Sequence, residues 1–208
     1  MNNKHIVLSG SFSVGKSSLI NEAREHYGDK YNYIEDGARK VLHMYFPEKK
    51  LGDLNDQEYN YFQRKVLDWY LHQEKIVDPS KVTISDGSLI EVAAYGSLVF
   101  SKEIQEIVMQ LLEERINNKV YSVIKLPVGT FEIENDGERH EDNKLQYHID
   151  TRIQAVLNSY IIDQVNISSL VDGIKHRFSI VKTALENLEH YGSLQSKRTP
   201  NTLRKPVL

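Results

Sequence analysis

Residues 10–17 read GSFSVGKS and match the pattern G-x-x-x-x-G-K-[ST] at every fixed position. The segments on either side supply the context that this pattern needs. His5–Ser9 (HIVLS) is a short apolar run, which predicts a buried strand that ends at a glycine. Lys16–Tyr27 is predicted to be the helix that follows. A strand, a glycine-rich loop and a helix in this order predict a phosphate-binding loop, the P-loop.

The spacing of this motif has a direct physical reason. Gly10 and Gly15 allow the backbone to curl so that several N–H groups point at one phosphate, and the following helix adds its positive dipole end. We expect Lys16 to act as the catalytic lysine at the β- and γ-phosphates, and the Ser17 hydroxyl to ligate Mg²⁺. The predicted cofactors are therefore ATP and Mg²⁺. The predicted nucleotide-binding residues are Gly10, Ser11, Phe12, Ser13, Val14, Gly15, Lys16, Ser17 and Ser18.

Strand-like and helix-like segments alternate along the chain, which is typical of a parallel sheet with helices on both faces. We therefore predict an α/β P-loop NTPase fold with a mostly parallel five-stranded sheet. The expected strands are His5–Ser9, Tyr31–Glu35, Val82–Ser85, Val120–Leu126 and Val165–Leu170. The expected helices are Lys16–Tyr27, Ala38–Tyr45, Asn55–Val77, Ile90–Val99, Ser101–Asn117, Leu145–Ile161 and Gly173–His190.

The chain divides into one predicted domain, residues 1–191, and a basic tail, residues 192–208. Net charge is −3; the tail holds +4 and no acid, so the remainder carries −7. An acidic body argues against a broad nucleic-acid surface. The tail is read as a solvated, flexible end, with contact to an anionic partner as the alternative.

Two further features bear on where the protein works. No apolar run approaches the roughly 20 residues that a membrane helix needs, and the chain has no cysteine. We expect a cytoplasmic protein without membrane contact. The oligomeric state is not fixed by any pattern in the sequence.

Two acidic positions follow predicted strands. Asp86 comes directly after Val82–Ser85, where a P-loop protein places the carboxylate that holds Mg²⁺; the alternative is a cap on the next helix. Asp36 follows the second strand and would accept a proton from a substrate hydroxyl, while Arg39 would bind substrate or phosphate. The alternative is that Asp36 caps the second helix and Arg39 is solvated.

The expected nucleotide is ATP because no guanine-reading motif is present. Asn118-Lys119-Val120-Tyr121 begins like Asn-Lys-x-Asp but lacks the aspartate. Asp86-Gly87-Ser88-Leu89 is not the Asp-x-x-Gly switch motif either.

The chain resembles the AAA-type ATPase and kinase family that includes the ribosylnicotinamide kinase domain of bacterial NadR-type proteins. The resemblance spans most of residues 5–185. Only the P-loop is specific alone; the other matches gain weight from their order and spacing. They are Asp36-Gly37-Ala38-Arg39, Phe62-Gln63, Glu74, Asp86, Ala93-Ala94-Tyr95, Asp136-Gly137-Glu138-Arg139, Asp142 and Ile149-Asp150. Gly87 departs from the pattern, since relatives often carry arginine there.

The resemblance implies a small-molecule kinase fold that uses ATP and Mg²⁺. In such kinases a lid between the fourth strand and the next helix delivers an arginine to the transferring phosphate. The corresponding segment is about residues 127–144, which is polar and acidic. Arg139 is its one arginine and the expected catalytic residue, with Arg152 in the following helix second.

The long predicted helix Asn55–Val77 carries many aromatic residues. Its stripe of Tyr59, Phe62, Val66, Trp69 and Ile76 predicts one buried face. Off this stripe, Tyr61 and Tyr70 are candidates to stack on a substrate ring, and Gln63 to read a base edge.

Taken together, these patterns predict a kinase that transfers the ATP γ-phosphate to a hydroxyl of a small nucleoside-like or vitamin-like acceptor. Two alternatives stay open: an ATP-dependent switch with slow hydrolysis, and a nucleic-acid end kinase anchored by the basic tail. No histidine spacing indicates a zinc site.

Overall fold

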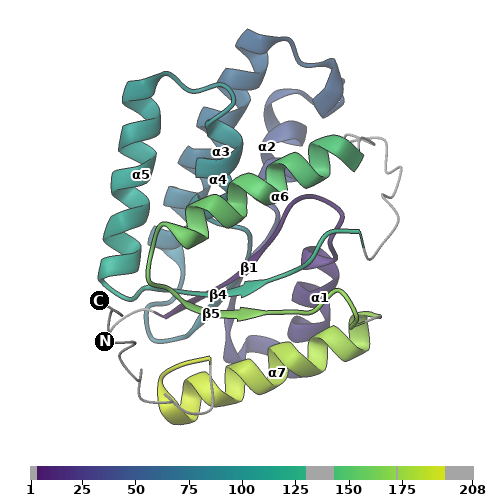
Figure 1. Ribbon diagram of the computed structural model, residues 1–208, viewed down its shortest axis with the longest axis vertical. Helices are drawn as coiled ribbons and strands as arrows, with labels where there is room; N and C mark the ends of the chain where they lie inside the picture. The colour runs from purple at the N-terminus through teal and green to yellow at the C-terminus, as the bar shows by residue number, and fades with distance from the viewer. Residues whose placement is uncertain (1–3, 130–142, 172, 195–208) are drawn as a thin grey trace, which may run out of the picture.

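Five parallel strands form one sheet in the order β2-β3-β1-β4-β5 (Figure 1). The computed structural model describes residues 4–129, 143–171 and 173–194. The strands are β1 (His5–Ser9), β2 (Asn32–Ile34), β3 (Thr83–Asp86), β4 (Tyr121–Lys125) and β5 (Asp163–Asn166). The α-helices are α1 (Lys16–Tyr27), α2 (Gly37–Tyr45), α3 (Asp56–Ile76), α4 (Leu89–Gly96), α5 (Lys102–Asn117), α6 (Asn143–Asn158) and α7 (Ile174–Tyr191). The predicted α/β fold class with a parallel five-stranded sheet is confirmed.

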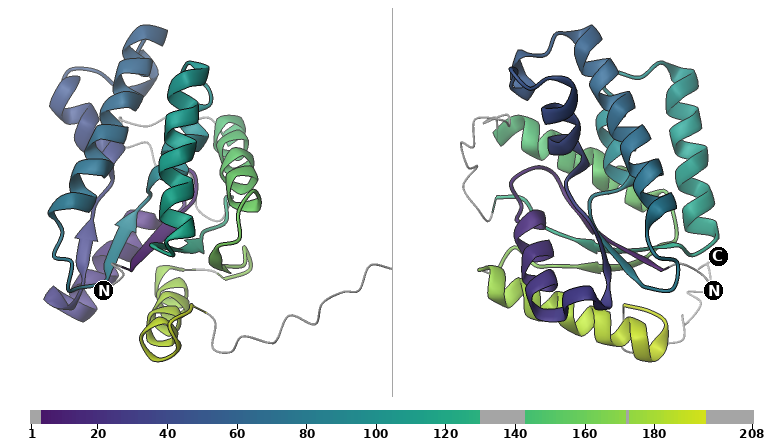
Figure 2. Two further views of the ribbon diagram at one scale, coloured as in Figure 1. Left: turned by 90° about the vertical axis from the view of Figure 1, so that its left-hand side faces the viewer. Right: turned by 180° about the vertical axis from the view of Figure 1, so that it is seen from behind.

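The central strand β1 is buried on both faces, which explains its uninterrupted apolar sequence. Its side chains alternate between two cores, as the period of a strand requires. Ile6 and Leu8 pack with α1 and α7, whereas Val7 packs with the core beneath α2 to α6. Figures 1 and 2 show α1 and α7 together on one side of the sheet and α3, α4, α5 and α6 on the other.

Local signals fix where two of the helices begin. The Asn55 side chain accepts a hydrogen bond from the Glu58 amide, and Glu58 accepts one from the Asn55 amide, which is a capping box at the start of α3. Ser88 and Glu91 form the same arrangement at the start of α4. None of the described helices is long and apolar enough to cross a membrane.

Two expectations from the sequence are corrected here. The fifth strand is Asp163–Asn166 rather than Val165–Leu170, because polar DQVN pairs with the edge of β4 and Asp163 accepts hydrogen bonds from Ser193 and Leu194. Leu170, assigned to that strand, is exposed. Ile76 is 60% exposed because it is the last residue of α3, so the buried face of that helix ends earlier than the spacing suggested.

At the amino-terminal edge of the sheet, His5 lies in a buried polar cluster. Glu74 connects the residues of this cluster. It accepts a hydrogen bond from Tyr121 Oη and another, at 3.1 Å, from Arg115 Nε. The Nε2 atom of His5 has no hydrogen-bond partner among the described residues. Burial, with a smaller contribution from the charge of Arg115, lowers the pKa of His5 to about 3.

We expect His5 to make stability fall as the solution becomes acidic. The folded-state pKa lies below the unfolded value of about 6.5, so the unfolded state binds the proton first and stability is lost as pH falls from about 6.5 toward 3. Between about pH 7.5 and pH 5, wild type should lose about 2 kcal/mol of unfolding free energy more than His5→Phe, which cannot titrate. Urea unfolding at both pH values measures this difference; equal losses would show that folded His5 protonates normally.

Candidate active site

A cavity of about 460 Å³ opens at the carboxyl ends of β1, β2 and β3. This is the edge of an open parallel sheet where ligands bind. Residues 10 and 12–18 form one wall of it, and side chains from α2, α3 and α4 form the others. The P-loop and the candidate substrate residues of α2 and α3 therefore meet in one space.

Glycine is required at two positions of the P-loop. A Cβ at Gly10 would lie 2.9 Å from Val14 Cγ2 and 3.2 Å from the Leu126 carbonyl oxygen, so the close backbone approach admits no side chain. Gly15 precedes α1 with φ of 88°, in the left-handed region that favours glycine. Ser13 also has a positive φ, of 56°. Positive φ angles at Ser13 and Gly15, on either side of Val14, give the loop the kind of backbone turn from which anion-binding nests are built.

Side chains from three helices fasten the P-loop through its carbonyl groups. Lys16 Nζ on α1 donates to Gly10 O at 2.9 Å and to Ser11 O at 2.6 Å. Gln146 on α6 donates to Phe12 O at 2.8 Å, and Arg177 on α7 donates to Val14 O at 3.0 Å. No pattern in the sequence indicated Gln146 or Arg177, because each contact joins segments far apart along the chain.

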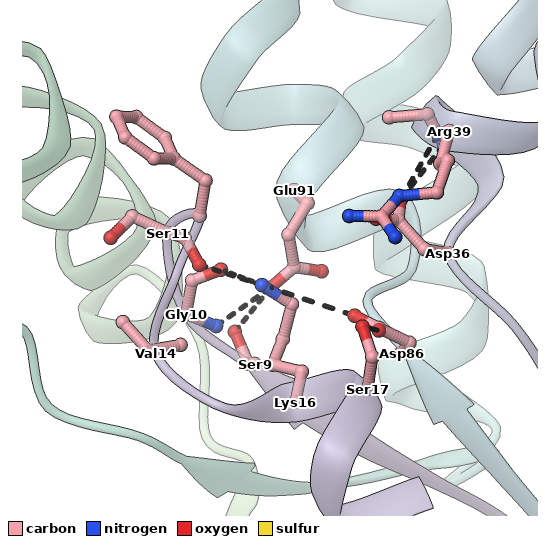
Figure 3. A network of polar contacts seen from close by, with 12 residues as sticks. Ser9, Gly10, Ser11, Val14, Lys16, Ser17, Asp36, Arg39, Asp86 and Glu91 are labelled. Carbon is pink, nitrogen blue, oxygen red and sulfur yellow. Dashed lines mark hydrogen bonds and ion pairs between the residues drawn. The ribbon is translucent and has the colours of Figure 1, made fainter. Parts of the chain in front are cut away.

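Ser17 and Asp86 meet at the far end of the loop (Figure 3). Ser17 Oγ donates to Asp86 Oδ2 at 2.5 Å, and Lys16 Nζ lies 3.9 Å from Asp86 Oδ1. Asp86 ends β3 and is 2% exposed. A hydroxyl beside a buried carboxylate is a donor set that suits Mg²⁺. No group of three or more His, Cys, Asp or Glu within the described ranges could hold a metal, but Mg²⁺ completes its shell with water and phosphate oxygens.

Asp36 is the N-cap of α2 and also lines the cavity. Its Oδ1 atom accepts hydrogen bonds from the amides of Ala38, at 3.1 Å, and Arg39, at 3.3 Å. The helix-cap interpretation of Asp36 therefore describes a real contact. It does not exclude the base role, because the same carboxylate borders the space beside Lys16. Arg39 lines that space as well.

Part of the cavity lining is apolar. Phe62, Val66 and Tyr70 of α3 line it together with Val92 of α4. Among them lies Gln63, which is 4% exposed. This wall suits a flat, mostly apolar group with one polar edge.

Tyr70 belongs to the core and does not project as a free stacking ring. It is buried, and its hydroxyl donates to the Asp86 carbonyl oxygen at 2.6 Å. Burial first, and then the charges of Asp36, Asp86 and Glu91, raise the pKa of Tyr70 well above its usual value. The hydroxyl therefore stays protonated and keeps donating to the end of β3.

Two of the predicted substrate-binding residues that the structure describes do not line the cavity. Tyr61 is 46% exposed on the outer side of α3, in edge contact with Tyr45, and does not line the cavity. Arg152 donates to Ser97 Oγ at 2.6 Å and to His148, and it does not line the cavity either. The roles of Tyr61 and Arg152 in substrate binding stay predictions. Arg139 and most of the predicted lid lie outside the described residues, as does most of the predicted tail.

Glu91 lines the cavity and was not selected from the sequence. Its carboxylate is buried and contacts both the end of β1 and the start of α4. The pattern Ser88-x-x-Glu91 was a readable capping signal, but nothing in the sequence indicated a contact with Ser9 or Gly10.

Comparisons with known proteins agree with this geometry. A family model described as an AAA domain matches residues 5–172. NadR protein in complex with NR is a similar solved structure, with a TM-score of 0.62 and 18% identity over 86% of this chain and 51% of that one. The chain thus spans about half the length of that NadR structure. Among curated protein sequences, no match was found.

Two kinases of similar length share the fold more completely. The deoxyadenosine kinase from M. mycoides gives a TM-score of 0.59 and 18% identity over 88% of this chain and 99% of that one. Thymidylate kinase from Candida albicans gives 0.58 and 13% identity over 90% and 93%. At these identities the likeness establishes a P-loop kinase fold and leaves the substrate open.

Proposed function

The chain belongs to the AAA domain family, and from that membership and the geometry of its cavity we propose that it is an ATP-dependent small-molecule kinase. It binds ATP-Mg²⁺ on the P-loop and transfers the γ-phosphate to a hydroxyl of a nucleoside-like or vitamin-like acceptor. The observation that carries the proposal is the shared cavity. Lys16, Ser17 and Asp86 line it together with Gln63 and the apolar side chains around Gln63.

The phosphate end supplies charge and orientation. Lys16 Nζ already points across the loop, where it contacts Gly10 O and Ser11 O, and would turn to the β- and γ-phosphates of bound ATP. Ser17 and Asp86 would hold Mg²⁺ between them, directly or through water. The ion would supply the positive charge that neutralises the phosphate oxygens.

The acceptor end supplies recognition and a proton acceptor. The apolar wall would bury the ring of the acceptor, and the Gln63 amide would bind its polar edge. Asp36 would take the proton of the attacking hydroxyl as its oxygen bonds to the γ-phosphorus and the bond to ADP breaks. Arg39, three residues along α2, would orient the acceptor or the transferring group.

We expect ADP release from ATP-Mg²⁺ to depend on an added acceptor. The panel should include nucleosides, nucleotides, nicotinamide riboside and 5′-hydroxyl oligonucleotides. We also expect ATP-Mg²⁺ to raise the melting temperature more than GTP-Mg²⁺ does, because no guanine-reading motif is present. ATP binding without turnover on any acceptor would favour the switch interpretation. Turnover with oligonucleotides as the sole acceptors, and its loss as the salt concentration is raised, would favour the nucleic-acid end kinase.

A further inference from the structure

We infer that Glu91 is a positioning residue that holds the entrance of the P-loop against α4. The inference deepens the proposed function, since it concerns how the ATP cradle keeps its place beside the acceptor wall. Glu91 is 7% exposed and lines the cavity, and Figure 3 shows its side chain beside Ser9, Gly10 and Lys16.

The two carboxylate oxygens of Glu91 face different elements. Oε1 accepts hydrogen bonds from Ser9 Oγ at 2.5 Å and from the Gly10 amide at 3.2 Å. Oε2 accepts from the Ser88 amide at 2.7 Å and from Ser88 Oγ at 3.3 Å. One side chain therefore joins the end of β1 and the first P-loop residue to the first turn of α4.

Helix capping accounts for only half of this arrangement. A capping box needs one acceptor oxygen from Glu or Gln, and Oε2 satisfies it through Ser88. The remaining oxygen has no capping role, yet it receives a buried hydroxyl and a buried amide. Burying a carboxylate is unfavourable unless hydrogen bonds compensate it, so a glutamate at this position is best explained by its need to serve both sides.

The contact with Gly10 bears directly on the phosphate cradle. The Gly10 amide donates to Glu91, and the Gly10 carbonyl oxygen accepts from Lys16 Nζ at 2.9 Å. Gly10 is thus held from both sides, by Glu91 and by the lysine expected at the phosphates. A shift of Glu91 would move the first turn of the loop and the carbonyl that orients Lys16.

On the α4 side, Glu91 is followed by residues of the cavity lining. Val92 and Tyr95 follow Glu91 on α4 and line the same cavity. Because its two carboxylate oxygens accept hydrogen bonds from Ser9 and Gly10 on one side and from Ser88 on the other, Glu91 fixes the distance between the P-loop and α4. Asp36 keeps the base role in the proposed reaction.

The test compares the same chemical change at two capping boxes. Glu91→Gln alters the buried box of α4, and Glu58→Gln alters the exposed box of α3, which lies outside the cavity lining. A glutamine at 91 replaces one acceptor oxygen by an NH₂ group. That group then faces hydrogen-bond donors, either Ser9 and Gly10 or Ser88. We expect Glu91→Gln to raise the Kd for ATP-Mg²⁺ about fivefold or more and to lower turnover about tenfold. Glu58→Gln should leave both within about twofold.

A second variant keeps the test decisive if Glu91→Gln folds poorly. Ser9→Ala removes only the hydroxyl that donates to Oε1 and leaves the Ser88 side of the carboxylate intact. We expect it to weaken ATP binding in the same direction, measured well below the melting temperature. Wild-type Kd and turnover in Ser9→Ala, or in folded Glu91→Gln, would overturn the inference. The ATP Kd needs no acceptor, so this result is independent of whether the proposed kinase reaction is found.

Discussion

Lys16→Ala is expected to remove phosphoryl transfer almost completely while the protein stays folded. The lysine places a positive charge at the P-loop, where its Nζ atom lies 2.6 Å from Ser11 O and 3.9 Å from Asp86 Oδ1. It would stabilise the charge that builds on the transferring phosphate, and removing one such group typically lowers the rate about 10²–10³-fold. The side chain is no part of either apolar core, so the melting temperature without nucleotide should change little.

Two measurements check this expectation. Turnover with a true acceptor should fall to near background, and the stabilisation of the protein by ATP-Mg²⁺ should shrink. Lys102→Ala is the matched control, because that lysine is 87% exposed at the start of α5, where it forms an ion pair with Glu106, and does not line the cavity. Wild-type turnover in Lys16→Ala would mean that the P-loop does not carry the reaction.

Asp36→Asn is expected to lower acceptor-dependent turnover at least about tenfold without changing ATP binding. Loss of a general base usually lowers rates about 10²–10⁴-fold, and a loose phosphoryl-transfer transition state favours the low end. The substitution preserves the helix cap, because asparagine retains an oxygen that can accept from the amides of Ala38 and Arg39. The comparison therefore separates the proton-accepting role of Asp36 from its observed capping role.

Asp36→Ala completes the comparison. It removes both the cap and the base, and it should lower stability by about 1 kcal/mol in addition to lowering turnover. If Asp36→Asn turns over as wild type does, Asp36 is only a cap. If ATP-induced stabilisation is lost with Asp36→Asn, the carboxylate acts in the metal shell instead, and the role of Asp86 must be reassigned.

The sequence predicted those parts of the fold and site whose signals are local. The P-loop could be read directly because its residues are contiguous, and β1 was bounded correctly because an apolar run ended at Gly10. Asp86 was selected because it follows a buried strand, and in the structure it accepts a hydrogen bond from Ser17; its metal role stays a prediction.

The features that the sequence did not reveal depend on contacts between distant segments. Glu91 reaches Ser9 across 82 positions, and no local pattern reports such a contact. The sequence also did not reveal that Tyr61 lies outside the cavity lining, because an aromatic residue off the buried stripe can face either a cavity or the outer surface; Tyr61 makes an edge contact with Tyr45. The prediction placed β5 too late in the sequence. The polar residues of this edge strand are stabilised by partners in β4 and beyond α7, and their hydropathy does not indicate a strand.

The position of β1 also bears on the order in which the molecule assembles during synthesis. β1 precedes the other described strands along the chain, yet its two neighbours in the sheet are β3 and β4, so His5 pairs with Thr83 on one side and Tyr121 on the other. Parallel strands cannot pair until the intervening crossover is complete, and such distant contacts form slowly. The strand that leads into the P-loop therefore cannot be fixed in the sheet until β3 and β4 have been synthesised. Nucleotide binding should appear only when β4 has emerged, as a late event in biogenesis.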